Sequence, residues 1–172
     1  MGERDVEILL QAAQAAIEGG EALGTQFLIP DGDRRWRVVC HDLDAVGQND
    51  LGIPPKVFAH GAVGALLQAL DAHECYVAEA ASLPTPAVVV TAFRTGRLEV
   101  GVHPYATGAG GQVSWGEPAL TSTRQPGALG AALPLWRAVN RQRSPMPPPD
   151  QLIEDMVDSG FMVMLEGGNG GG

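Results

Sequence analysis

The chain has 172 residues, 45% of them hydrophobic, which is enough for one domain with a sizeable core. Acidic residues outnumber basic ones by 20 to 11, giving a net charge of −9. This argues against nucleic acid and anionic membranes as partners, because both require concentrated positive charge. No segment approaches the roughly 20 apolar residues of a membrane span, residues 1–5 do not resemble a signal peptide, and two cysteines do not form a disulfide framework. We therefore expect a cytoplasmic protein, and its single lysine among abundant alanine, glycine and proline indicates a bacterial, archaeal or viral source.

The first predicted elements are a helix over residues 6–17 and a β-hairpin. Apolar residues recur at helical spacing in this segment, and Gly19-Gly20 ends the pattern. Residues 26–29 and 35–40 are predicted strands, and Pro30-Asp31-Gly32-Asp33 between them is a turn sequence. The two strands should therefore pair.

The polar segment 42–53 is predicted to be a loop, and the strand end before it carries the best chemical candidate, Cys40-His41-Asp42-Leu43-Asp44. His41 could act as a base oriented by Asp42, with help from His103, and His41 with Asp44 could contribute to a metal site. Cys40 does not easily share an ion with His41, because neighbouring residues of a strand point to opposite faces. The spacing matches no established signature, so a buried cysteine followed by a solvated loop is the favoured interpretation.

A second helix is predicted over residues 55–70. It begins at Pro54-Pro55, where proline suits a first helical turn, and it is apolar on most sides, as in a buried helix. Gly61 and Gly64 lower helix propensity, which the close approach of another backbone would explain. The polar residues interrupting the apolar surface form one narrow stripe with Gly64: Lys56, His60 and Gln68.

Three predicted strands follow, over residues 74–81, 87–93 and 97–103, the last two joined at Thr95-Gly96. In the last strand one face carries Leu98, Val100 and Val102, and the other carries Glu99, Gly101 and His103. We expect the 55–70 helix to cover the apolar face, with the first helix beside it, and Pro104 to end the pairing.

The remaining segments give weaker signals. The glycine-rich residues 107–111 lack the ending of a phosphate-binding loop, so no nucleotide cofactor is expected. Residues 112–115 are a predicted short strand, 117–127 irregular, and 129–142 helical, with Pro134 starting or kinking the helix. The predicted fold is α+β, with a mainly antiparallel sheet of about five to seven strands and helices packed on one face.

The C-terminal part is predicted to be an interaction arm. Residues 1–143 form the domain, the proline-rich residues 144–149 a stiff linker, and residues 150–172 the arm. The apolar residues of the arm are the predicted contact set: Leu152, Ile153, Met156, Val157, Phe161, Met162 and Met164. The alternative is that the arm folds back onto its own sheet or core, because apolar runs are usually buried in their own chain.

Two classes of function follow from these patterns. The first is a non-enzymatic protein-interaction or assembly module without a cofactor, whose simplest partner is a second copy of the chain. The second is a small enzyme or metal-binding protein that uses His41 and Asp42, with help from His103. The first is preferred because no nucleophile–base or metal-ligand signature is present, whereas a candidate interaction arm is.

Overall fold

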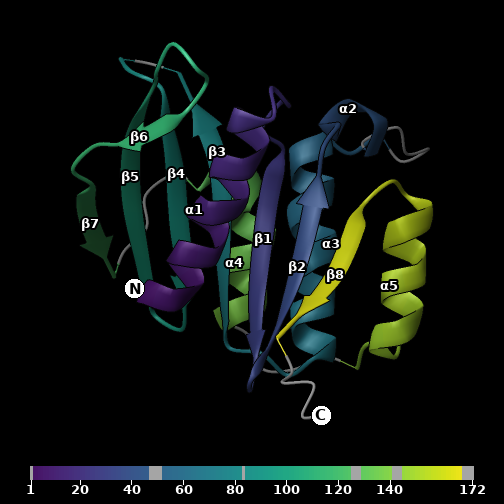
Figure 1. Ribbon diagram of the computed structural model, residues 1–172. Coiled ribbons are helices and arrows are strands. Elements are labelled where there is room, and N and C mark those ends of the chain that lie inside the picture. Colours follow the sequence, from purple (N-terminus) through teal and green to yellow (C-terminus); the bar gives the residue numbers. More distant parts are fainter. Residues whose placement is uncertain (1, 47–51, 83, 125–128, 141–144, 168–172) are drawn as a thin grey trace, which may run out of the picture.

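The computed structural model describes residues 2–46, 52–82, 84–124, 129–140 and 145–167, and its centre is an eight-stranded sheet (Figure 1). The helices are α1 Glu3–Glu18, α2 Leu43–Val46, α3 Pro55–Ala69, α4 Leu133–Asn140 and α5 Pro149–Asp158, with a 3-10 turn, η1, at Gly130–Ala132. The strands are β1 Thr25–Asp31, β2 Arg34–Cys40, β3 Glu74–Ala81, β4 Ala87–Arg94, β5 Arg97–Thr107, β6 Val113–Trp115, β7 Ala119–Thr123 and β8 Met162–Glu166. None of the described helices is long and apolar enough to cross a membrane.

The strand order is β6-β5-β4-β3-β1-β2-β8, and β7 pairs with the same edge of β5 as β6 does. Every described pairing is antiparallel, which confirms the predicted α+β class and antiparallel sheet. The sheet has more strands than the five to seven expected. The additional pairing comes from β7, which lies in the segment predicted to be irregular; residues 125–127 of that segment lie outside the described ranges.

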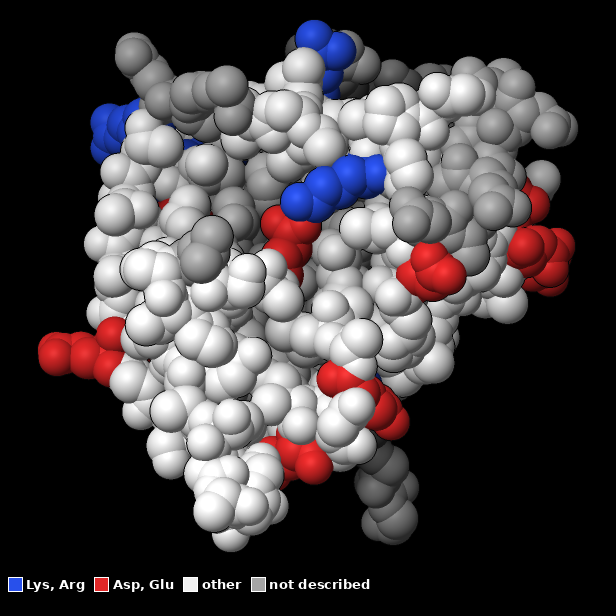
Figure 2. Space-filling view, turned by 90° about the horizontal axis from the view of Figure 1, so that it is seen from above, with Lys and Arg blue, Asp and Glu red and all other residues white. Residues whose placement is uncertain are grey.

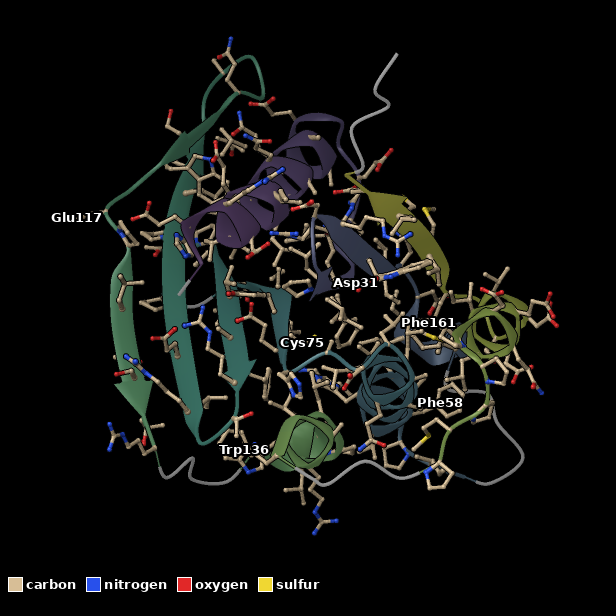
Figure 3. All side chains as sticks on the ribbon, turned by 90° about the horizontal axis from the view of Figure 1, so that it is seen from below. Asp31, Phe58, Cys75, Glu117, Trp136 and Phe161 are labelled. Atoms are coloured by element: carbon tan, nitrogen blue, oxygen red, sulfur yellow. The ribbon has the colours of Figure 1, made fainter. Side chains whose placement is uncertain are left out.

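The helices divide between the two faces of the sheet, with α3 and α4 on one face and α1 on the other (Figures 1 and 3). The α3 face buries Phe27, Val77, Phe93 and Leu98 against Val63, Leu66 and Leu67 of α3, as expected for that helix. The α1 face buries Leu28, Tyr76, Val88 and Val90 against Val6, Leu9 and Ala13 of α1. The expectation that the first helix lies beside α3 is therefore wrong. Both faces of the central strands are apolar, so each face needs its own cover.

Two-residue turns set the register of both hairpins. Gly32 in the β1–β2 turn has φ +60°, and Gly96 in the β4–β5 turn has φ +69°, a region that glycine enters without steric cost. The pairing of β5 with β4 ends at Pro104, opposite Ala87, as predicted, although β5 itself continues to Thr107 and pairs there with β6. Pro104 lies opposite the interruption between β6 and β7, so the ladder needs no N–H donor at this position. The backbone carbonyl of Pro104 accepts a hydrogen bond from the N–H of Gly116 at 2.7 Å.

The predicted 55–70 helix is confirmed as α3, and the predicted 129–142 helix consists of η1 and α4 up to Asn140. Gly64 explains how α3 and α4 meet: a Cβ at this position would stand 3.1 Å from Cβ of Ala138. Gly61 has no such neighbour. The predicted loop after β2 contains the short helix α2, and its residues 47–51 lie outside the described ranges.

The C-terminal segment belongs to the same packed unit as the rest of the chain. Strand β8 pairs with β2 over five residues, and α5 contributes Met156 to the α3-face core. Phe161, just before β8, is buried and stacks on Phe58 of α3 with ring centroids 6.3 Å apart. The described part of the predicted arm therefore folds back onto its own sheet and core.

Candidate functional site

The structure places His103 far from His41 and Asp42, the other two side chains that the sequence suggested for catalysis. His41 and Asp42 follow the end of β2 and are exposed, and the backbone carbonyl of Asp42 accepts a hydrogen bond from Val46 in α2. His103 lies on β5, four strand positions away across the sheet, which corresponds to about 19 Å at the usual strand spacing. These residues therefore do not form one constellation.

A metal site that includes His41 and Asp44 stays a prediction. The side chain of Asp44 lies outside what the structure describes, and the described residues contain no group of three or more His, Cys, Asp or Glu side chains placed to hold a metal ion. Cys40 and Cys75 are free and buried. Burial raises the pKa of both thiols, with a smaller contribution from Asp42 at Cys40 and from Glu74 at Cys75, so both stay protonated near neutral pH.

His103 borders a groove of about 570 Å³ between α1 and the outer strands. The floor is mainly apolar and includes Leu10, Trp115 and Leu120, and the rim carries Glu3 and Glu7. Nε2 of His103 is buried and has no hydrogen-bond partner among the residues that the structure describes, and burial lowers the pKa of this imidazole. The groove is a recess that α1 leaves uncovered on its side of the sheet.

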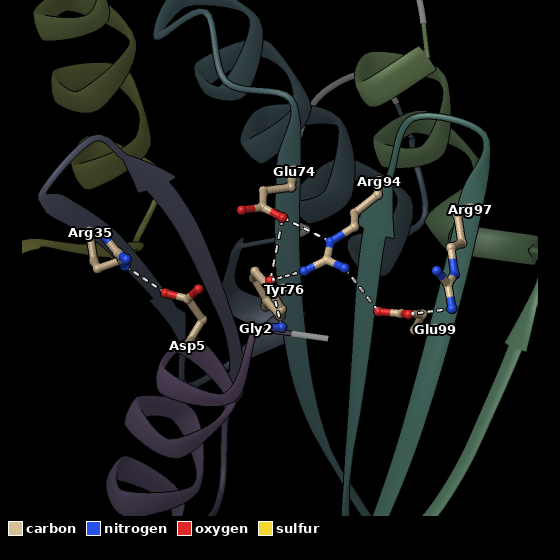
Figure 4. Close-up of polar contacts among 8 residues, drawn as sticks. All are labelled: Gly2, Asp5, Arg35, Glu74, Tyr76, Arg94, Arg97 and Glu99. Atoms are coloured by element: carbon tan, nitrogen blue, oxygen red, sulfur yellow. Dashed lines mark hydrogen bonds and ion pairs between the residues drawn. The ribbon is translucent and has the colours of Figure 1, made fainter.

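A polar cluster at one end of the same face has a structural role (Figure 4). Arg94 donates to Glu74 at 2.9 Å, to Tyr76 Oη at 2.8 Å and to Glu99 at 3.2 Å. The Tyr76 hydroxyl also accepts from the backbone N–H of Gly2 at 3.1 Å, and Asp5 pairs with Arg35 at 2.5 Å. These contacts fix the start of α1 on the sheet, and the paired groups use their bonding capacity on one another.

A polar cavity lies on the other face, and it was not predicted from the sequence. Its volume is about 240 Å³, and α3, β3, β4, β5 and η1 enclose it. Lys56 and Glu79 form an ion pair of 2.7 Å, and His60, one turn after Lys56, lines the cavity. Figure 2 shows a hollow with adjacent basic and acidic side chains at the end of the molecule where α3 begins. The polar stripe of the helix was the available signal, but the sequence could not show that Glu79 meets it.

The predicted contact residues of the C-terminal segment are divided between core and surface. Met156 and Phe161 are buried, and Leu152 and Ile153 are partly buried against the α3-face core. Met164 is half-buried, with its sulfur 3.7 Å from Nη2 of Arg37. Val157 and Met162 are exposed, as is Leu165, which was not in the predicted set. Only the exposed residues are available to a partner.

Comparison with known proteins gives no assignment. No protein-family model matches the chain, and neither the curated protein sequences nor the solved structures contain a significant match.

Proposed function

We propose that this protein is a non-enzymatic interaction module that associates through the outer edge of β8, most simply with a second copy of itself in the cytoplasm. The observation that carries the proposal is the position of β8 at the end of the sheet, where β2 is its one neighbour among the described strands. An edge strand presents unpaired N–H and C=O groups that can pair with another chain. Phe161, the residue before β8, is buried in the α3-face core and anchors the start of the strand.

The register identifies the backbone groups that point outward. Hydrogen-bonding direction alternates along antiparallel strands, and the two-residue β1–β2 turn makes Asp31 and Arg34 a bonded pair. It follows that Arg35, Arg37 and Val39 direct their backbone groups toward β8, where they face Glu166, Met164 and Met162. The intervening residues of β8, Val163 and Leu165, therefore direct their N–H and C=O groups to the open edge.

The side chains near this edge are also suited to association. Met162 is 46% exposed and Leu165 is 45% exposed. Met162 and Leu165 lie on opposite faces of the strand, so apolar surface flanks the open backbone groups on both sides. Burying these side chains against a partner would stabilise the contact by the removal of apolar area from water.

A second copy is the partner that this edge fits most simply. Two identical strands can pair antiparallel about a two-fold axis, so that each Val163 and Leu165 meets its equivalents in the other copy. The result would be one continuous sheet across both copies. Pairing of this edge therefore requires no second kind of protein.

A pair of proline substitutions tests the proposal. Leu165→Pro removes an outward N–H without removing a bond to β2, and Ser122→Pro is the matched change on the exposed strand β7 at the opposite edge. Light scattering should give a dimer for the parent chain and for Ser122→Pro, and a folded monomer for Leu165→Pro. A parent chain that is monomeric at all concentrations, or a dimer that survives Leu165→Pro, would overturn the proposal. Truncation before α5 is a poorer test, since it removes Met156 and Phe161 from the core.

A further inference from the structure

The cavity beside α3 contains a buried imidazole with one engaged nitrogen. His60 is 2% exposed, and its Nδ1 lies 2.7 Å from the backbone carbonyl of Lys56. A carbonyl only accepts, so Nδ1 must carry the proton, which leaves Nε2 as an acceptor in the neutral ring. Within the described residues Nε2 has no hydrogen-bond partner. The imidazole also packs against the ring of Phe27 in a T-shaped arrangement, with the ring centroids 5.2 Å apart, and this contact helps to hold it in place.

The ring is held in its neutral form by its surroundings. Burial lowers the pKa of His60, and Lys56 acts in the same direction, whereas the backbone hydrogen bond and Glu79 oppose the shift. An unfilled acceptor on a buried, oriented side chain is the kind of polar group that fixes the orientation of a ligand in a mainly apolar pocket.

The residues that line the cavity determine the polarity, charge and size of a ligand that fits it. Thr91 adds a hydroxyl, and the other inner walls are apolar, including Val77, Phe93 and Val100. Lys56 and Glu79 neutralise each other, and no other charged side chain of the described residues lines the cavity, so there is no net attraction for an ion. The volume of about 240 Å³ is slightly below the ~300–1,000 Å³ of pockets that hold drug-sized ligands.

We propose that this cavity binds a small, uncharged organic molecule with an apolar body, whose O–H or N–H group donates a hydrogen bond to Nε2 of His60. The apolar body would lie against Val77, Phe93 and Val100, and Thr91 offers a second polar contact. No residue of β8 lines the cavity, so ligand binding in the cavity and association through the β8 edge can be tested independently.

A pair of probes tests the hydrogen bond directly. 2-Naphthol carries a donor, and 2-methoxynaphthalene has the same ring system without one. Titration of the full chain followed by NMR should move the imidazole signals of His60 with 2-naphthol, and 2-methoxynaphthalene should bind at least about tenfold more weakly because it leaves Nε2 unpaired. No perturbation up to millimolar concentration, or equal affinity for the two probes, would overturn the proposal.

Variants locate the effect at His60. His60→Phe keeps an aromatic ring against Phe27 but removes the acceptor, so the preference for 2-naphthol should disappear. His73→Phe is the matched control, because His73 is exposed and lies outside the cavity. Retention of the preference in His60→Phe, or its loss in His73→Phe, would contradict the proposal. If His60→Phe does not fold, acidification of the parent chain provides the test: protonation of His60, which faces Lys56 and Glu79, should abolish the preference, and its persistence would count against the site.

Discussion

The two edges of the sheet differ in how they limit pairing with other chains. On the β5 side the edge is divided between β6 and β7, with an interruption at residues 116–118 that includes Pro118. The side chains of β7 are all exposed, and three of its five residues are Thr or Ser. On the β2 side, β8 is uninterrupted and carries exposed Met162 and Leu165. An interrupted, polar edge discourages pairing, whereas an ordered apolar edge permits it.

The edges also differ in their connection to the core. β8 follows directly after Phe161, which is buried among the side chains of the α3 face. The most apolar residue of β7, Leu120, is 65% exposed. The difference indicates that β8 is part of the folding unit, whereas β7 is an addition to its margin, and the following changes test this distinction.

The largest expected effect is on stability. Phe161→Ala should lower the free energy of unfolding by about 3–5 kcal/mol, because it removes a buried aromatic ring and leaves a cavity beside Phe58. Leu120→Ala, the matched change at the other edge, should stay within about 0.5 kcal/mol of the parent chain. Urea denaturation followed by circular dichroism measures both. Similar values for the two variants would show that β8 is no better integrated than β7.

A smaller effect is expected at the β2–β8 junction. Arg37 bridges the strands: it pairs with Glu166 at 2.5 Å and also contacts Gln26 and Met164. Arg37→Met should cost about 1 kcal/mol, since the pair is partly screened by solvent. Arg34→Met, whose pair with Asp31 is more exposed and lies at the hairpin, should have an effect close to zero. Equal losses in the same denaturation experiment would mean that the contact does not anchor β8.

The smallest effect concerns the dependence of stability on pH at the β5 side. Burial lowers the pKa of His103 below its ordinary value of about 6.5, so below that pH the unfolded chain binds a proton that the folded chain does not. The free energy of unfolding therefore decreases as the pH falls from about 6.5 toward the lowered pKa of the folded state. His60 contributes with the same sign.

His103→Phe should reduce this pH dependence without abolishing it, because His60 remains. The acidic groups beside the His103 groove, Glu3 and Glu7, are unchanged in the variant. Denaturation at neutral pH and at about pH 5.5 measures the difference. An unchanged pH dependence of the free energy of unfolding would show that His103 does not contribute to it. Strands β2 and β8 contain no histidine, so their junction has no corresponding response in this range.

The sequence predicts the locally determined parts of the fold well. Apolar periodicity and turn residues predict α1, α3 and both hairpins, because these elements depend on neighbours along the chain. The position of α1 on the second face, the pairing of β7 with β5 and the return of β8 to β2 depend on contacts between distant segments, which periodicity does not encode. The His60 cavity was missed for the same reason. The polar stripe of α3 is visible in the sequence, but Glu79 joins it only through the packing of β3.

The most direct test of the proposed assembly is amide hydrogen exchange at Val163 and Leu165 in the full chain. The register directs both N–H groups to the open edge, where no described strand pairs with them, so protection from exchange would indicate a partner. We expect slow exchange at high protein concentration, rapid exchange on dilution, and rapid exchange at Val163 in Leu165→Pro at every concentration. Rapid exchange at both positions in concentrated parent protein would contradict the account, even if the protein were dimeric, because association would then use a different surface.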